Sequence, residues 1–223
     1  PSQPSQPSEP SQPSQPSQPS QPSQPSQPSQ PSQPSQPSEP ELKFIDVNEG
    51  DWFYNSVMWA VKNGVTVGTT PTTFEPYTAC TRAQMIEFLW NAVGKPAATI
   101  KSVPFTDVPE SGSDDYWYED SLLWAYQSGI VAGMNDGSTF SPDQVCTRAE
   151  MISFIARLLS DGATKDMPFV DVPASAWYYN EVQWAWANGL TVGTNDGTTF
   201  SPDNACIRAE AVEFLYNAFA EVE

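Results

Sequence analysis

The chain has 223 residues, with 27 acidic and nine basic side chains and a net charge of −18. So few cations cannot build the basic face that binding to nucleic acids or anionic lipids requires. Histidine is absent, which excludes histidine-based nucleophilic triads and His-ligated zinc. The sequence also lacks a run of 18 apolar residues, so no membrane-spanning helix is predicted.

Residues 1–40 consist of thirteen Pro-Ser-Gln or Pro-Ser-Glu triplets and one further proline. Such a segment cannot bury enough apolar surface to offset its chain entropy, so we predict a disordered linker with polyproline II character. Its extended reach would be about 120 Å at about 3.1 Å per residue. Two alternatives are a ligand for an aromatic groove and O-glycosylation of its serines. We expect the chain to be part of a longer or processed protein, with cargo upstream of the linker.

Three copies of one unit follow the linker, and we assign them to residues 41–100, 101–164 and 165–223. Each copy has the same landmarks in the same order: Phe-x-Asp-Val, an aromatic pair, Gly-x-x-x-Gly, Phe-x-Pro and Cys-x-Arg-Ala. Self-similarity at a fixed period indicates a repeat architecture. The equivalent arginines are Arg82, Arg148 and Arg208.

Two helices joined by a loop are predicted in each copy. The first helices cover residues 57–62, 122–127 and 182–187, and a glycine follows each where a C-terminal cap belongs. The second helices begin near the arginines, where Thr81 precedes Gln84 and Thr147 precedes Glu150 at capping-box spacing. Ile207 replaces the threonine in copy three, so this helix lacks a hydroxyl cap, at a cost of about 1 kcal/mol.

A two-helix unit of this size would be marginally stable alone. Three copies can bury their apolar faces around a shared centre, with copy three closing against copy one. We therefore predict a mainly α fold with three helix-loop-helix repeats in a pseudo-threefold arrangement, formed by one monomeric chain.

The ordered landmarks resemble the S-layer homology (SLH) domain, three times over from residue 44 to about residue 220. The resemblance implies a secreted module at the bacterial cell wall or S-layer surface. It also implies non-covalent binding to a secondary cell-wall polysaccharide that carries ketal-linked pyruvate. The chain would then be a non-enzymatic anchor that tethers an upstream cargo or S-layer protein, without cofactor, metal, nucleic acid or membrane insertion.

A pyruvyl ketal presents a carboxylate, which suits the planar fork of an arginine at the start of a helix. The three equivalent arginines and the capping threonines, Thr81 and Thr147, are therefore candidate ligand-binding residues. An alternative is that each arginine forms a structural salt bridge to an aspartate of Phe-x-Asp-Val. These aspartates, which could also orient the arginines, are Asp46, Asp107 and Asp171.

Two further sets complete the candidate site. Three tryptophans of the aromatic pairs could stack on sugar rings or belong to the core; they are Trp52, Trp117 and Trp177. Three glycines could let a ligand approach the backbone or serve turn geometry; they are Gly68, Gly133 and Gly193. From the completeness of each copy's Thr-Arg-Ala-Glu motif, we expect copy three to contribute the weakest site.

The cysteines, Cys80, Cys146 and Cys206, occupy equivalent positions. Buried free thiols, a disulfide between two copies and a three-thiolate metal site are the alternatives. Two other functions remain open beside wall anchoring. The module could assemble S-layer subunits through protein–protein contacts, or it could belong to a wall-glycan hydrolase, although neighbouring acids such as Asp114 and Asp115 do not make a glycosidase site.

Overall fold

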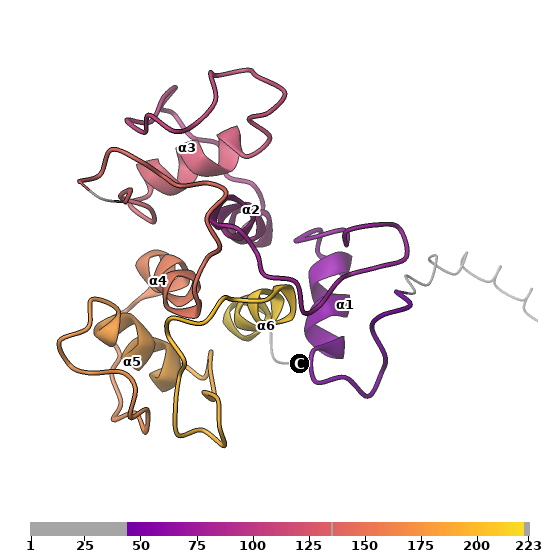
Figure 1. The fold of residues 1–223 in the computed structure, drawn as a ribbon, viewed down its shortest axis with the longest axis vertical. Coiled ribbons are helices and arrows are strands. Elements are labelled where there is room, and N and C mark those ends of the chain that lie inside the picture. Colours follow the sequence, from indigo (N-terminus) through magenta and orange to yellow (C-terminus); the bar gives the residue numbers. More distant parts are fainter. Residues whose placement is uncertain (1–43, 135, 221–223) are drawn as a thin grey trace, which may run out of the picture. The chain divides into compact units, whose positions relative to one another are not determined.

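A computed structural model describes residues 44–134 and 136–220 (Figure 1). These residues form six α-helices and no extended strand, which confirms the predicted mainly α class. The predicted linker, residues 1–40, lies outside the described residues. The helices are α1 (Tyr54–Lys62), α2 (Arg82–Ala92), α3 (Glu119–Gln127), α4 (Arg148–Leu159), α5 (Tyr179–Ala187) and α6 (Arg208–Phe219).

The second helices of the three copies, α2, α4 and α6, meet at the centre, and the first helices lie outside them (Figure 1). Each outer helix packs on the inner helix of the preceding copy: α3 on α2, α5 on α4 and α1 on α6. The last pair closes the ring, with the Trp59 and Tyr216 rings 5.7 Å apart. This arrangement is the predicted pseudo-threefold closure of copy three against copy one.

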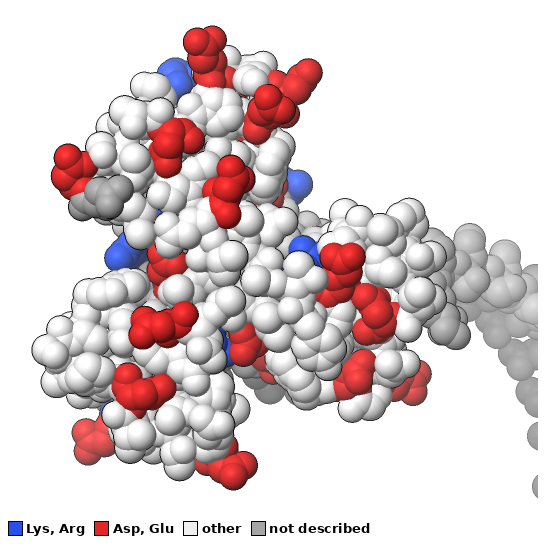
Figure 2. Space-filling view, viewed as in Figure 1, with Lys and Arg blue, Asp and Glu red and all other residues white. Residues whose placement is uncertain are grey.

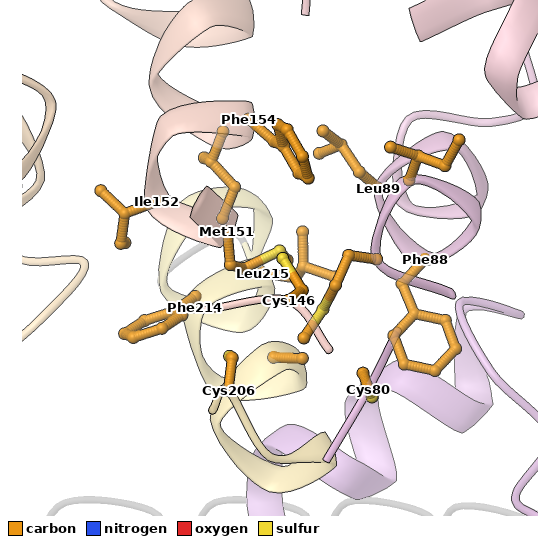
Figure 3. Packing of buried hydrophobic residues seen from close by; sticks show 14 of the residues in the cluster. Cys80, Phe88, Leu89, Cys146, Met151, Ile152, Phe154, Cys206, Phe214 and Leu215 are labelled. Atoms are coloured by element: carbon orange, nitrogen blue, oxygen red, sulfur yellow. The ribbon is translucent and has the colours of Figure 1, made fainter. Parts of the chain in front are cut away.

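A cyclic set of backbone hydrogen bonds joins the copies at the cysteines. Cys146 N donates to Cys80 O at 2.9 Å, Cys206 N to Cys146 O at 2.9 Å, and Cys80 N to Cys206 O at 3.1 Å. The three side chains are fully buried free thiols among apolar residues of the inner helices (Figure 3). Burial raises the pKa of each thiol, to about 11 for Cys80. The first of the three cysteine alternatives is therefore the one observed.

The helix ends agree with the capping arguments. Thr81 and Thr147 cap α2 and α4 in complete capping boxes. Ile207 has no acceptor atom in its side chain, so only the Glu210 carboxylate, which accepts from Ile207 N at 3.2 Å, assists the start of α6. The outer helices begin three residues earlier than predicted, because polar residues of the first turn carry no apolar periodicity.

Candidate functional site

Three aspartates each fix the Phe-x-Pro turn of their own copy. Asp107 accepts from Phe140 N at 2.8 Å and from Ser141 N at 2.7 Å, and the carboxylate holds Ser141 in a left-handed conformation with φ of 57°. The other two aspartates, Asp46 and Asp171, make the equivalent bonds. The alternative of a salt bridge from these aspartates to the arginines is wrong, because the ion pairs among the described residues join the arginines to glutamates instead.

Each Phe-x-Pro turn accepts a hydrogen bond from an arginine of another copy. Arg82 Nε donates to Phe140 O at 2.9 Å, Arg148 Nε to Phe200 O at 2.9 Å, and Arg208 Nε to Phe74 O at 2.8 Å. Each guanidinium carbon also lies about 5 Å from two phenylalanine rings, one in the turn and one in the adjoining inner helix. The aspartates thus orient the arginines indirectly, through the turn.

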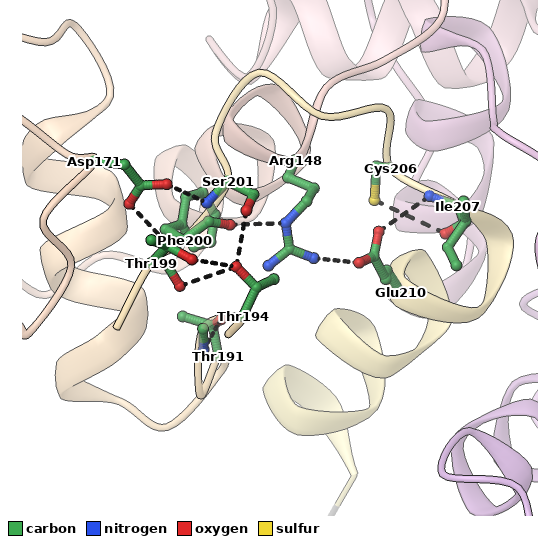
Figure 4. Close-up of polar contacts among 11 residues, drawn as sticks. Arg148, Asp171, Thr191, Thr194, Thr199, Phe200, Ser201, Cys206, Ile207 and Glu210 are labelled. Atoms are coloured by element: carbon green, nitrogen blue, oxygen red, sulfur yellow. Dashed lines mark hydrogen bonds and ion pairs between the residues drawn. The ribbon is translucent and has the colours of Figure 1, made fainter. Parts of the chain in front are cut away.

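Two of the arginines have glutamate partners from the next copy. Arg82 Nη1 lies 2.6 Å from Glu150 Oε1. Arg148 Nη1 lies 2.6 Å from Glu210 Oε1, the pair drawn in Figure 4. The same glutamates cap their own helices through the second oxygen. The Arg and Glu of one Cys-Thr-Arg-Ala-Glu motif therefore face different partners, so the motif does not form one site within one copy.

Arg208 differs because copy one has Gln84 where the other copies have glutamate. Gln84 Oε1 accepts from Thr81 N, and Arg208 Nη2 donates to Thr66 Oγ1 at 3.3 Å. Among the residues that the structure describes, Arg208 forms no ion pair. Burial lowers the pKa of its guanidinium, as expected for a charge removed from water.

Two grooves each contain one of the paired arginines. The Arg82 groove has a volume of about 500 Å³ and the Arg148 groove about 430 Å³. The Arg82 groove is lined by Arg82, residues 131–134, Glu150, Ser153, Phe154, Arg157 and Trp177. The Arg148 groove is lined by Arg148, residues 190–194, Glu210, Glu213, Phe214, Asn217 and Trp52.

Every copy contributes to both grooves. In the Arg82 groove, copy one provides the arginine, copy two the loop and the α4 face, and copy three provides Trp177. In the Arg148 groove, copy two provides the arginine, copy three the loop and the α6 face, and copy one provides Trp52. All three copies are therefore required to assemble either groove, and the Arg148 groove also needs the closing contact of copy one with copy three.

The three candidate tryptophans are exposed. Trp52, Trp117 and Trp177 have 56%, 56% and 59% of their surface accessible, so the alternative that they belong to the core is wrong. Each precedes its helix, and its ring lies against the next aromatic residue of the chain in an edge-to-face contact. The rings are thus held in place while much of their surface remains free to contact a ligand.

The candidate glycines and threonines have structural tasks. Gly133 and Gly193 line the grooves, and a Cβ atom at either position, or at Gly68, would collide with the phenylalanine of Phe-x-Asp-Val. All three have φ between 78° and 87°. Thr81 and Thr147 use their hydroxyls as helix caps, and neither lines the two described grooves.

The sequence analysis did not single out several polar groove residues, among them Glu213, Asn217 and Arg157. These three lie five or nine residues after the motif arginines, on the exposed edge of the inner helices. Helical periodicity alone could have placed them on one face with the motif glutamate. The local sequence pattern does not show that they share a groove with an arginine of another copy.

Acidic side chains are distributed over the visible face of all three lobes, while basic side chains are few (Figure 2). Within the described ranges, no three Cys, Asp or Glu side chains come close enough together to hold a metal ion. No helix in the described part of the chain is long and apolar enough to cross a bilayer. The arginines of the grooves are therefore among the few cations on a surface whose charged side chains are mostly acidic.

Comparison with known protein families identifies the repeat. The family model described as the S-layer homology domain matches residues 43–86, 104–152 and 168–212, more than half of the chain. The chain therefore belongs to the S-layer homology family, with three tandem repeats.

Curated relatives agree with this assignment. A cell surface protein of Thermoanaerobacter kivui is 34% identical over 133 residues, which cover 57% of this chain and 16% of the relative. A surface-layer 125 kDa protein of Lysinibacillus sphaericus is 34% identical over 92 residues, covering 41% and 8%. An endoglucanase of Bacillus sp. (strain KSM-635) is 28% identical over 183 residues, covering 77% and 18%. The chain thus spans less than a fifth of each of these relatives, and the family places it at the cell-wall or S-layer surface.

Proposed function

We propose that the three repeats anchor their parent protein non-covalently to a cell-wall polysaccharide that carries ketal-linked pyruvate. The observation that carries the proposal is the construction of the grooves: each combines a buried arginine, an exposed tryptophan and the loop that follows an outer helix. A pyruvylated sugar has a matching carboxylate, apolar ring face and ketal methyl group.

The arginines retain hydrogen-bonding capacity for such a ligand. A guanidinium has five N–H donors, and Arg82 and Arg148 each use Nε and Nη1 for protein partners. Neither Nη2 has an acceptor among the described residues (Figure 4 shows Arg148). A carboxylate that reaches Nη2 would meet a donor already oriented by a turn carbonyl and a glutamate.

The dimensions and apolar surfaces of the grooves also suit a sugar. Volumes of about 430 and 500 Å³ lie in the range of small-molecule sites. Trp52 and Trp177 present exposed rings at the groove walls, and Val192 is 77% exposed beside Trp52 in the Arg148 groove. Apolar ring faces and methyl groups would remove this surface from water.

The test is a pull-down with purified cell walls before and after mild acid removal of ketal-linked pyruvate. Binding to untreated walls and its loss after treatment would support the proposal. Trp177→Ala and Trp52→Ala should weaken retention, because both rings line grooves and are too exposed to hold the core. Equal retention by treated and untreated walls would exclude pyruvate as the recognised group.

The same preparation tests the two other functions. Self-association of the protein without wall polymer would favour an S-layer assembly module. Release of soluble sugars from the wall would favour a hydrolase. If the module acts only as an anchor, the walls should retain the protein, and neither self-association nor release of soluble sugars should occur.

A further inference from the structure

The two grooves differ in the charges on their walls. Arg82 and Arg157 face one acidic residue, Glu150, in the Arg82 groove, for a formal net charge of +1. In the Arg148 groove, one arginine faces both Glu210 and Glu213, for a formal net charge of −1. The difference arises at two equivalent positions, where Ser153 and Arg157 of α4 correspond to Glu213 and Asn217 of α6.

Arg157 is suited to contact a ligand. Unlike the buried Arg82, it is an exposed residue in the last turn of α4. Its Nη1 donates to Ile130 O at 2.8 Å, which anchors the guanidinium at the groove wall. No carboxylate of the described residues forms an ion pair with it. Its remaining N–H donors are therefore available to an anion without breaking an existing ion pair.

At the equivalent position of α6, Asn217 donates to Leu190 O at 3.3 Å. Both side chains thus hold the loop that follows the outer helix, but only Arg157 brings a charge. The hydrogen bond to the loop is therefore common to both residues, and the positive charge is present only in Arg157. The charge can thus be tested separately from the contact with the loop.

We propose that the Arg82 groove is the preferred site for an anionic sugar and that Arg157 sets this preference as a second carboxylate-binding cation. The inference rests on the proposed function, since it ranks the two grooves for the same ligand. A difference of two unit charges within one screening length should change the affinity for a monoanion about fivefold to tenfold. For an uncharged analogue the two grooves should differ much less.

Two matched probes separate charge from shape. The first is a methyl hexopyranoside with a 4,6-linked pyruvate ketal, and the second is the same glycoside with a 4,6-isopropylidene ketal. The second replaces the carboxylate by a methyl group and keeps the bicyclic shape. Binding is followed by ¹⁹F NMR of protein labelled with 5-fluorotryptophan, because Trp177 lies in the Arg82 groove and Trp52 in the Arg148 groove. Trp177→Phe and Trp52→Phe assign the two resonances.

The expected result is about fivefold to tenfold tighter binding of the pyruvylated probe at Trp177 than at Trp52. Arg157→Asn, which copies the residue of the other groove, should reduce this difference to about twofold to threefold, because Glu213 still supplies the other unit of charge difference. Arg157→Lys should keep most of it. The reciprocal Asn217→Arg should tighten binding at Trp52. None of these three variants should alter binding of the isopropylidene probe by more than about twofold, because this probe carries no charge.

Different failures contradict different claims. Equal affinity of the two grooves for the pyruvylated probe, or no effect of Arg157→Asn, would overturn the ranking and leave wall binding intact. An equal loss with both probes in Arg157→Asn would assign Arg157 a packing role only. No response of either tryptophan to the pyruvylated probe would contradict the proposed function itself, and with it the ranking.

Discussion

Replacing Glu150 by glutamine is expected to destabilise the ring of repeats, because it leaves the buried Arg82 charge without its counter-ion. Arg82 Nη1 and Glu150 Oε1 lie 2.6 Å apart, and the side chains are only 4% and 9% exposed. Glutamine keeps the size of the side chain and one acceptor oxygen. That oxygen can accept from Arg82 or from Thr147 N but not from both, so the substitution keeps the packing and removes the charge and one hydrogen bond.

The size of the effect follows from this burial. Removing one partner of a buried ion pair costs about 3–5 kcal/mol, and the acceptor that glutamine retains recovers about 0.5–1.5 kcal/mol of it. We expect Glu150→Gln to lower the free energy of unfolding by about 1.5–4.5 kcal/mol. Since about 1 kcal/mol corresponds to about 2–4 °C for a domain of this size, Tm should fall by about 3–18 °C.

Equilibrium urea denaturation and calorimetry measure this change, and the chain offers two comparisons. Glu210 is 21% exposed, so Glu210→Gln should cost less. Gln84→Glu places a carboxylate at the equivalent position opposite Arg208 and should change stability in the opposite direction. An unchanged Tm in Glu150→Gln, or a greater loss in Glu210→Gln, would refute the view that buried inter-repeat pairs hold the ring.

Three other predictions concern a glycine, a helix cap and a groove tryptophan. Gly193→Ala should cost more than Gly189→Ala in urea denaturation: both glycines have φ above 70°, but only a Cβ at Gly193 would meet the Phe169 ring and lie 2.6 Å from Thr199 O; equal losses would contradict the close-packing argument. Thr147→Val should destabilise by about 1 kcal/mol through loss of the α4 cap, measured by calorimetry, and no loss would mean that the Thr147 cap is not stabilising. Trp177→Ala should weaken binding at the Arg82 groove about tenfold and shift Tm by less than about 3 °C; unfolding at room temperature would instead assign the ring a core role.

Much of the fold follows from local sequence. The glycines after each outer helix, the capping boxes at Thr81 and Thr147, and the repeated landmarks predicted six helices in three copies, and the need to bury apolar faces predicted closure. The starts of the outer helices were missed by three residues, because a polar first turn gives no apolar signal.

The sequence identified many residues of the candidate site, but it did not show which residues they contact. Arg82 was identified, but its partner Glu150 lies 68 residues further on, in another copy, and no local pattern joins two copies. The aspartates were expected near the arginines and instead hold the turn whose carbonyl receives the arginine. Arg157 carried no motif signal, because its importance depends on the groove that three copies form together.

A crystal structure of the protein with the pyruvylated glycoside tests the central claim most directly, since each groove is proposed to bind one sugar with residues from all three copies. We expect the pyruvyl carboxylate to lie within hydrogen-bond distance of Arg82 Nη2 and Arg157, with the sugar ring or ketal methyl against Trp177. A glycoside bound away from both grooves, or in a groove with its carboxylate directed into solvent, would contradict the central claim.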